Sequence, residues 1–150
     1  MPKRDKWELE DDKPMLWRAT IDARARQLGQ RVSEDVRWAL FALQSVLEGF
    51  TARPGSDFVR DVLLYGPFAN GVWADVMSVV VIVRADASPA GRSRVWDDLD
   101  ELLADAERMY ALKFDCVVLN EADIVDPQRM PPDWPIIVAD HVVVWSTNHA

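Results

Sequence analysis

Residues 62–71 read Val-Leu-Leu-Tyr-Gly-Pro-Phe-Ala-Asn-Gly, and residues 78–83 read Ser-Val-Val-Val-Ile-Val. Both apolar runs are short, and Gly66, Pro67 and Gly71 lie between them. This pattern predicts two strands joined by a turn. The second run shows no polar–apolar alternation, which is typical of a strand that is covered on both faces. We therefore expect a hairpin with a buried second strand.

Helical patterns precede this hairpin. Pro14 is suited to the first turn of a helix that reaches Gly29, and Ser33 is suited to cap a second helix. The second helix is predicted to be amphipathic, because its large apolar residues recur at helical spacing. These residues are Val36, Leu40, Leu43, Leu47 and Phe50. Residues 1–13 are charged and are expected to form a flexible acidic arm, or a segment that docks through Trp7.

A long helix, two strands and a short helix are predicted after the hairpin. Ser88 and Pro89 begin the long helix, which has an apolar side and a charged side that is expected to face solvent. The apolar side carries Val95, Leu99, Leu102, Leu103, Ala106 and Tyr110. The charged side carries Asp97, Asp98, Glu101, Asp105 and Glu107. Residues 113–119 and 141–145 are predicted strands, and residues 134–139 a short helix.

The order of these elements predicts an α/β (α+β) domain, with a small mixed β-sheet and helices packed mainly on one face. The chain has 150 residues, of which 49% are hydrophobic, and this suffices for one core. We expect a single domain over residues 14–150 after the arm. Its N-terminal helices span 14–50, and its core sheet and helices span 58–146.

Charge and cysteine content narrow the possible functions. The formal net charge of -8 opposes binding along a phosphate backbone, so a nucleic-acid partner is not expected. The single cysteine, Cys116, lies in an apolar run and is expected to be a reduced, buried thiol. The sequence shows no zinc-binding pattern, no signal peptide and no apolar run of the ~18 residues that a membrane helix needs. We expect a soluble cytoplasmic protein.

The residues around the turn resemble the minimal nucleotidyltransferase family, relatives of DNA polymerase β. In that family a strand ends in Gly-Ser, a turn carries Ala-Arg-Gly, and the next strand presents Ser-Asp-x-Asp-x-x-Val. Five residues of this chain fall in matching places, namely Leu64, Gly66, Ala69, Gly71 and Val83. The resemblance covers residues 36–145, including a C-terminal helix and strand, and leaves residues 1–30 without a counterpart.

The resemblance implies a nucleotidyltransferase-like fold, but the family's catalytic residues are largely replaced. In the family the turn contacts nucleotide phosphates and the paired aspartates bind Mg²⁺. Here Pro67 stands in the position of the serine, and Asn70 in that of a basic residue. Ser78 and Val80 occupy the two aspartate positions, and valine offers no oxygen ligand to a magnesium ion. We therefore expect no metal site.

Two carboxylates remain as vestigial candidates for catalysis. Asp115 matches the third acid that a neighbouring strand supplies in the family. Asp75 would take the first metal position if the loop were shorter, but Met77 would then take the second. By the same resemblance, a vestigial nucleotide-binding turn comprises Gly66, Pro67, Ala69, Asn70, Gly71 and Ser78.

These departures favour a catalytically inactive protein, a pseudoenzyme that binds or regulates a protein partner and needs no cofactor. The resemblance implies an antitoxin-like partner of a helical protein, because small family members pair with such proteins in toxin–antitoxin systems; self-association as a homodimer is a further expectation. The alternative is an active Mg²⁺-dependent enzyme that uses a nucleoside triphosphate, with an unconventional site built from Asp75, Asp86 and Asp115. A third possibility is an unrelated α/β domain, which would be revealed if residues 58–65 and 78–83 were not neighbours.

Several residues have both a structural and a functional interpretation. Asp115 is either a metal ligand or an acid on an edge strand, and His141 is more typical of a packed or capping residue than of a catalyst. Trp38, Trp73 and Trp96 are either exposed contact residues or are covered by the N-terminal helix and arm. The apolar turn beside Trp73 suits a protein or a planar ring better than a triphosphate.

Overall fold

Four strands form one mixed sheet in the order β3-β2-β1-β4 in the computed structural model, which describes residues 16–147. The strands are β1 (Val59–Tyr65), β2 (Val76–Val83), β3 (Lys113–Asn120) and β4 (His141–Ser146). β1 pairs antiparallel with β2 and β4, and β3 pairs parallel with β2. The predicted mixed sheet is confirmed, and so is the pairing of the two strands of the hairpin.

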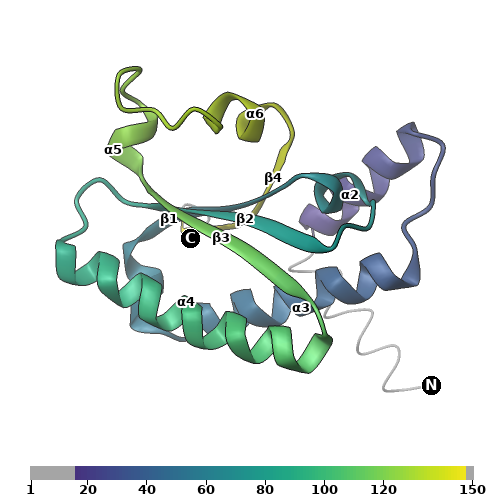
Figure 1. Cartoon of the computed structure of the whole chain (residues 1–150), viewed down its shortest axis with the longest axis horizontal. Coiled ribbons are helices and arrows are strands. Elements are labelled where there is room, and N and C mark those ends of the chain that lie inside the picture. Colours follow the sequence, from purple (N-terminus) through teal and green to yellow (C-terminus); the bar gives the residue numbers. More distant parts are fainter. Residues whose placement is uncertain (1–15, 148–150) are drawn as a thin grey trace.

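Two long helices, α3 (Glu34–Thr51) and α4 (Pro89–Tyr110), pack against one face of the sheet (Figure 1). Their predicted caps are both present. The Ser33 hydroxyl accepts a hydrogen bond from the Val36 N–H at 3.2 Å, and the Ser88 hydroxyl accepts one from Gly91 at 3.0 Å. These caps fix where each helix begins.

The remaining helical segments are short or lie at the margins of the sheet. Helix α2 (Leu16–Gln27) lies beside the turn of the hairpin, while α5 (Glu121–Ile124) and α6 (Trp134–Ala139) lie over the face opposite α3 and α4 (Figure 1). Two 3₁₀ segments, η1 (Pro54–Phe58) and η2 (Pro67–Asn70), flank β1. Among the described helices, none is both long and apolar enough to cross a membrane.

The sheet separates two apolar clusters of unequal size. The larger, here called the large core, contains the whole predicted apolar stripe of α3 and alternate strand residues such as Leu64 and Val81. The smaller, here called the small core, consists of Leu63, Val80, Ile82, Ile124 and Ile137. Because successive side chains of β2 enter different cores, both faces of this strand are buried, as the valine run predicted.

Asp98 corrects the prediction that the acidic side of α4 faces solvent. Its side chain is only 5% exposed, and its Oδ2 accepts a hydrogen bond from the Gly55 N–H at 2.8 Å. Its Oδ1 also lies 3.8 Å from Nη1 of Arg53. A helical pattern places Asp98 on the flank of the helix, but only the packed turn of η1 provides the donor that makes burial of the acid favourable.

Helix α5 is a second feature that the sequence pattern did not predict. It begins directly after β3, where Oδ1 of Asn120 accepts a hydrogen bond from the Ala122 N–H at 2.8 Å. The asparagine was the available signal, but a helix of four residues is too short to show periodicity. Its Ile124 forms part of the small core.

Candidate functional site

The turn between β1 and β2 carries the residues of the family resemblance. Gly66 and Gly71 have positive φ angles of 84° and 79°, a backbone region that favours glycine. Between them, Phe68 and Ala69 are fully buried in the large core. The turn therefore directs Phe68 and Ala69 into the protein, while Pro67 is exposed.

Helix α2 packs directly against this turn. A Cβ atom added to Gly71 would lie 3.1 Å from Cβ of Ala25. Arg24 donates from Nη1 to the Ala69 carbonyl at 3.3 Å and from Nη2 to the His141 carbonyl at 2.9 Å. The N-terminal helix, which had no counterpart in the resemblance, thus joins the turn to strand β4.

The polar groups beside the turn also pair with one another. Nδ2 of Asn70 donates to Oδ2 of Asp140 at 2.7 Å, and Oδ1 of Asp140 lies 3.7 Å from Nη1 of Arg24. A triphosphate at this turn would face the Asp140 carboxylate and compete with it for Arg24. The negative charge of the Asp140 carboxylate would repel the negative charge of the phosphates, so this arrangement disfavours a bound polyphosphate.

One row of polar residues crosses all four strands beside the turn. Strand register pairs Asp115 with Ser78, Ser78 with Tyr65, and Tyr65 with His141. These four residues, here called the polar row, lie on the face of the small core, because Ser78 is two positions from Val80. Asp115 is exposed, and the other three are half-buried. The structure therefore brings together Asp115 and Ser78, which the resemblance matches to the third acid and the first metal aspartate.

Val80, which the resemblance matches to the second metal aspartate, lies within the small core. Val80 is fully buried and packs with Ile124 from α5 and Ile137 from α6. A carboxylate at position 80 would lose its hydration without gaining a partner. An apolar side chain at position 80 is therefore required by the packing of the two short helices, α5 and α6.

The remaining candidate acids do not join the polar row. Asp75 precedes β2 and Asp86 follows it, and this strand of eight residues is roughly 25 Å long at ~3.3 Å per residue. Asp86 pairs instead with Arg84 at 3.1 Å. Within residues 16–147, no group of three or more His, Cys, Asp or Glu side chains is placed to hold a metal ion. Asp75, Asp86 and Asp115 therefore do not form one site.

Two other predicted residues have structural surroundings. Nδ1 of His141 lies 2.8 Å from the Val138 carbonyl at the end of α6, an arrangement typical of a capping residue. Cys116 packs against the large core, and burial raises the pKa of its thiol to about 12. The thiol is therefore protonated and weakly nucleophilic at neutral pH. Its side chain is partly buried and not fully buried as predicted, because β3 is an edge strand of the sheet.

The three tryptophans singled out in the sequence are exposed in the described part of the chain. Trp38 is 57% exposed, Trp73 47% and Trp96 42%, so α2 does not cover them. The ring of Trp38 lies 5.9 Å from that of Phe41 and 5.2 Å from that of Tyr110, and these three residues form an aromatic patch on α3 and α4. The predicted arm, including Trp7, lies outside the described residues.

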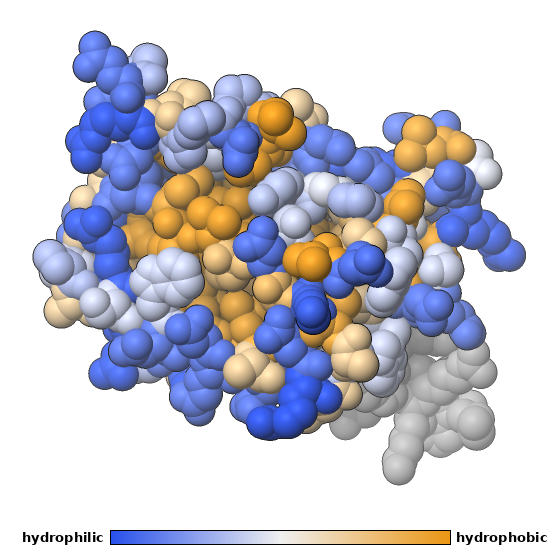
Figure 2. All heavy atoms as spheres, in the orientation of Figure 1, coloured by the Kyte–Doolittle hydropathy of each residue, from blue (hydrophilic) through white to orange (hydrophobic). Residues whose placement is uncertain are grey.

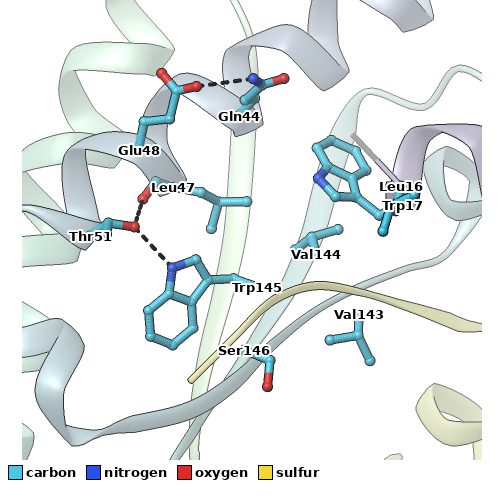
Figure 3. Close-up of a pocket in the computed structure, with 10 residues that line it drawn as sticks. All are labelled: Leu16, Trp17, Gln44, Leu47, Glu48, Thr51, Val143, Val144, Trp145 and Ser146. Atoms are coloured by element: carbon cyan, nitrogen blue, oxygen red, sulfur yellow. Dashed lines mark hydrogen bonds between the residues drawn. The ribbon is translucent and has the colours of Figure 1, made fainter. Parts of the chain in front are cut away.

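A pocket between α2, α3 and β4 was not indicated by the sequence. Its volume is about 630 Å³, and Figure 3 shows the residues that line it. Its wall is mainly apolar and includes the two tryptophans Trp17 and Trp145. Gln44 donates to Glu48 at 3.0 Å, while its Oε1 has no hydrogen-bond partner among the described residues. The pocket lies on the side of the large core and has no paired acids.

The site indicated by the resemblance is therefore a sheet face with one exposed acid, Asp115, and a buried valine, Val80. Asp115 lies beside Ser78, Val80 is buried, and α2 occupies the turn. Comparisons of the chain with protein-family models, with curated proteins and with solved structures find no match.

Proposed function

We propose that this chain is a catalytically inactive, nucleotidyltransferase-like domain that binds another protein. The observation that carries the proposal is the complete burial of Val80, at the position where the resembling family holds its second metal aspartate. The strand arrangement supports the resemblance. β1 and β2 form an antiparallel hairpin, and β3 lies beside β2 with Asp115 next to Ser78.

Binding is favoured over catalysis by the groups that the polar row offers. Two-metal chemistry needs several oxygen ligands around a common point, and the row contains a single carboxylate, that of Asp115. Exposed aromatic side chains such as Trp38 favour a role in protein contacts. The net charge of -8 favours a basic partner.

Titration calorimetry with ATP and Mg²⁺ tests the loss of catalytic function. We expect no Mg²⁺-dependent binding at micromolar ATP, because Val80 offers no ligand and Asp140 opposes a polyphosphate at the turn. Micromolar binding that requires Mg²⁺, disappears in Asp115→Ala and persists in Asp86→Ala would overturn the proposal. Asp86 is the matched control because it lies at the other end of β2, paired with Arg84.

A further inference from the structure

The two edge strands of the sheet, β4 and β3, differ in how their outer sides are protected from pairing with another strand. On the β4 edge, the register with β1 shifts between Val62 and Leu63, and Arg24 of α2 hydrogen-bonds to the His141 carbonyl. Bulges and covering elements are known ways of protecting an edge strand from pairing. On the other edge, β3 follows β2 through all eight of its residues without a register shift, and no described strand pairs with its outer side.

The outer edge of β3 is apolar in its centre. Val117 is 36% exposed, and Cys116, Val118 and Leu119 are partly buried. Figure 2 shows hydrophobic side chains gathered over this strand, between α4 and α5. A regular, apolar and β-branched edge is a template on which another extended chain can form a strand.

The backbone of β3 has donors that point away from β2. The Phe114 N–H donates to Oε2 of Glu107 at 2.9 Å, so it faces the outer edge. Successive residues of a strand turn their N–H groups to alternate edges, and the N–H groups of Cys116 and Val118 therefore face outward as well. Glu107 caps the first outward donor, and the next two are directed toward the position of an added strand.

We propose that the outer edge of β3 binds an extended, basic segment of a partner protein, which adds a fifth strand to the sheet. This inference rests on the proposed protein-binding function and names its surface and the chemistry of the partner. Backbone hydrogen bonds to Cys116 and Val118 supply affinity for such a segment. Its basic side chains meet acids on both faces of β3, where Asp115 is exposed on one face and Asp100 of α4 lies near Cys116 on the other.

The same acids oppose the pairing of β3 with a second copy of this chain. Pairing about a two-fold axis at this edge would join the same acidic surface of two molecules that each carry a net charge of -8. Like charges across paired strands are destabilising. Lys113 is the one basic residue of β3 and lies at its first position.

Amide hydrogen exchange of the full chain, resolved by NMR, tests the proposal with defined peptides. The probe is acetyl-Arg-Val-Arg-Val-Arg-Val-amide at millimolar concentration, and the control is the same peptide with Glu in place of Arg. We expect the basic peptide to slow exchange at Cys116 and Val118 at least tenfold and the acidic peptide to have no effect. Asp115→Lys, a change at an exposed side chain, should weaken protection by the basic peptide.

A proline variant tests whether the added strand uses the outward backbone. Val118→Pro removes an outward N–H and leaves the donors that face β2, so the sheet is retained while protection of Cys116 by the peptide is lost. Val118→Thr keeps the N–H and the branched side chain and should retain protection. Unchanged exchange at the hairpin amides shows that each variant is folded.

Three results would overturn the inference. They are an absence of protection by the basic peptide, equal protection by the acidic peptide, and protection that rises with protein concentration when no peptide is present. The last result would identify a second copy as the occupant. Failure here leaves the ATP titration unaffected, whereas Mg²⁺-dependent ATP binding would remove the proposed function and leave the peptide result standing.

Discussion

The two faces of the sheet use the same strands but are covered to different extents. On one face, α3 and α4 bury a continuous large core that includes Phe50. On the other, α5 and α6 cover only the small core, so Val80 is buried while Asp115, in the polar row, remains exposed. The boundary of this cover falls between Ser78 and Val80, the two positions that correspond to the paired aspartates of the resembling family.

This boundary separates two different environments within one strand. Ser78 is half-buried and lies beside Asp115, where another acid would remain hydrated. Val80 is enclosed by aliphatic side chains, where an acid would be desolvated without a partner. Placing carboxylates at both positions would therefore require opening the small core.

The largest effect on stability is expected when a charged side chain is introduced into the small core. Val80→Asp should lower the free energy of unfolding by about 4 kcal/mol, because a buried carboxylate has no partner there. Ser78→Asp, two positions along the same strand, should lower it by less than about 1 kcal/mol. Urea denaturation measures both changes. Equal stability of the two variants would show that α5 and α6 do not enclose position 80.

Asp98, on the other side of the sheet, is a buried acid that pairs with Gly55 and Arg53. Its removal should lower the free energy of unfolding by less than the buried charge at position 80. Asp98→Ala leaves the buried Gly55 N–H without its acceptor, so we expect a loss of about 2–3 kcal/mol in unfolding free energy. Asp97→Ala, at an exposed neighbour on α4, should change stability by less than about 0.5 kcal/mol. Thermal or urea unfolding compares them. A neutral Asp98→Ala would contradict a structural role for this acid.

Two adjacent isoleucines of α6 allow a buried position in the small core to be compared with an exposed one. Ile137 is 4% exposed in the small core, and Ile136 is 70% exposed. Ile137→Ala should cost about 2 kcal/mol and speed amide exchange at Val80, while Ile136→Ala should do neither. If exchange at Val80 were unchanged in Ile137→Ala, α6 would not be the element that closes this position.

The smallest effect concerns Cys116, which packs on the side of the large core. Burial raises the pKa of its thiol from 9.0 to about 12, so the folded protein holds this proton more tightly than the unfolded chain. The resulting stability is fully present below pH 9 and is lost as the pH rises toward 12. At pH 8 we expect slow reaction with Ellman's reagent in buffer and rapid reaction in denaturant. Rapid labelling of the folded protein would contradict this burial.

Local signals in the sequence accounted for most helices and strands. Ser33 and Ser88 cap α3 and α4 as predicted, because a hydroxyl that accepts from an N–H three residues later needs no distant partner. The valine run marked β2 as a strand buried on both faces. Helix α5 was missed because it is too short for periodicity, and the pocket was missed because its wall joins α2, α3 and β4.

For the candidate site, the types of the residues can be read from the sequence, whereas their burial depends on contacts between distant segments. The amino-acid sequence by itself shows that positions 78 and 80 carry serine and valine, and valine has no oxygen to bind a magnesium ion. The resemblance alone matches these positions to paired aspartates. The burial of Val80 under α5 and α6 is not visible there, because Ile124 and Ile137 reach it from 44 and 57 residues away. The contact of α2 with the turn and the unprotected edge of β3 likewise depend on how distant segments pack. Residue type thus determined the chemistry of positions 78 and 80, and the packing of distant segments determined which side chains are buried and which are exposed.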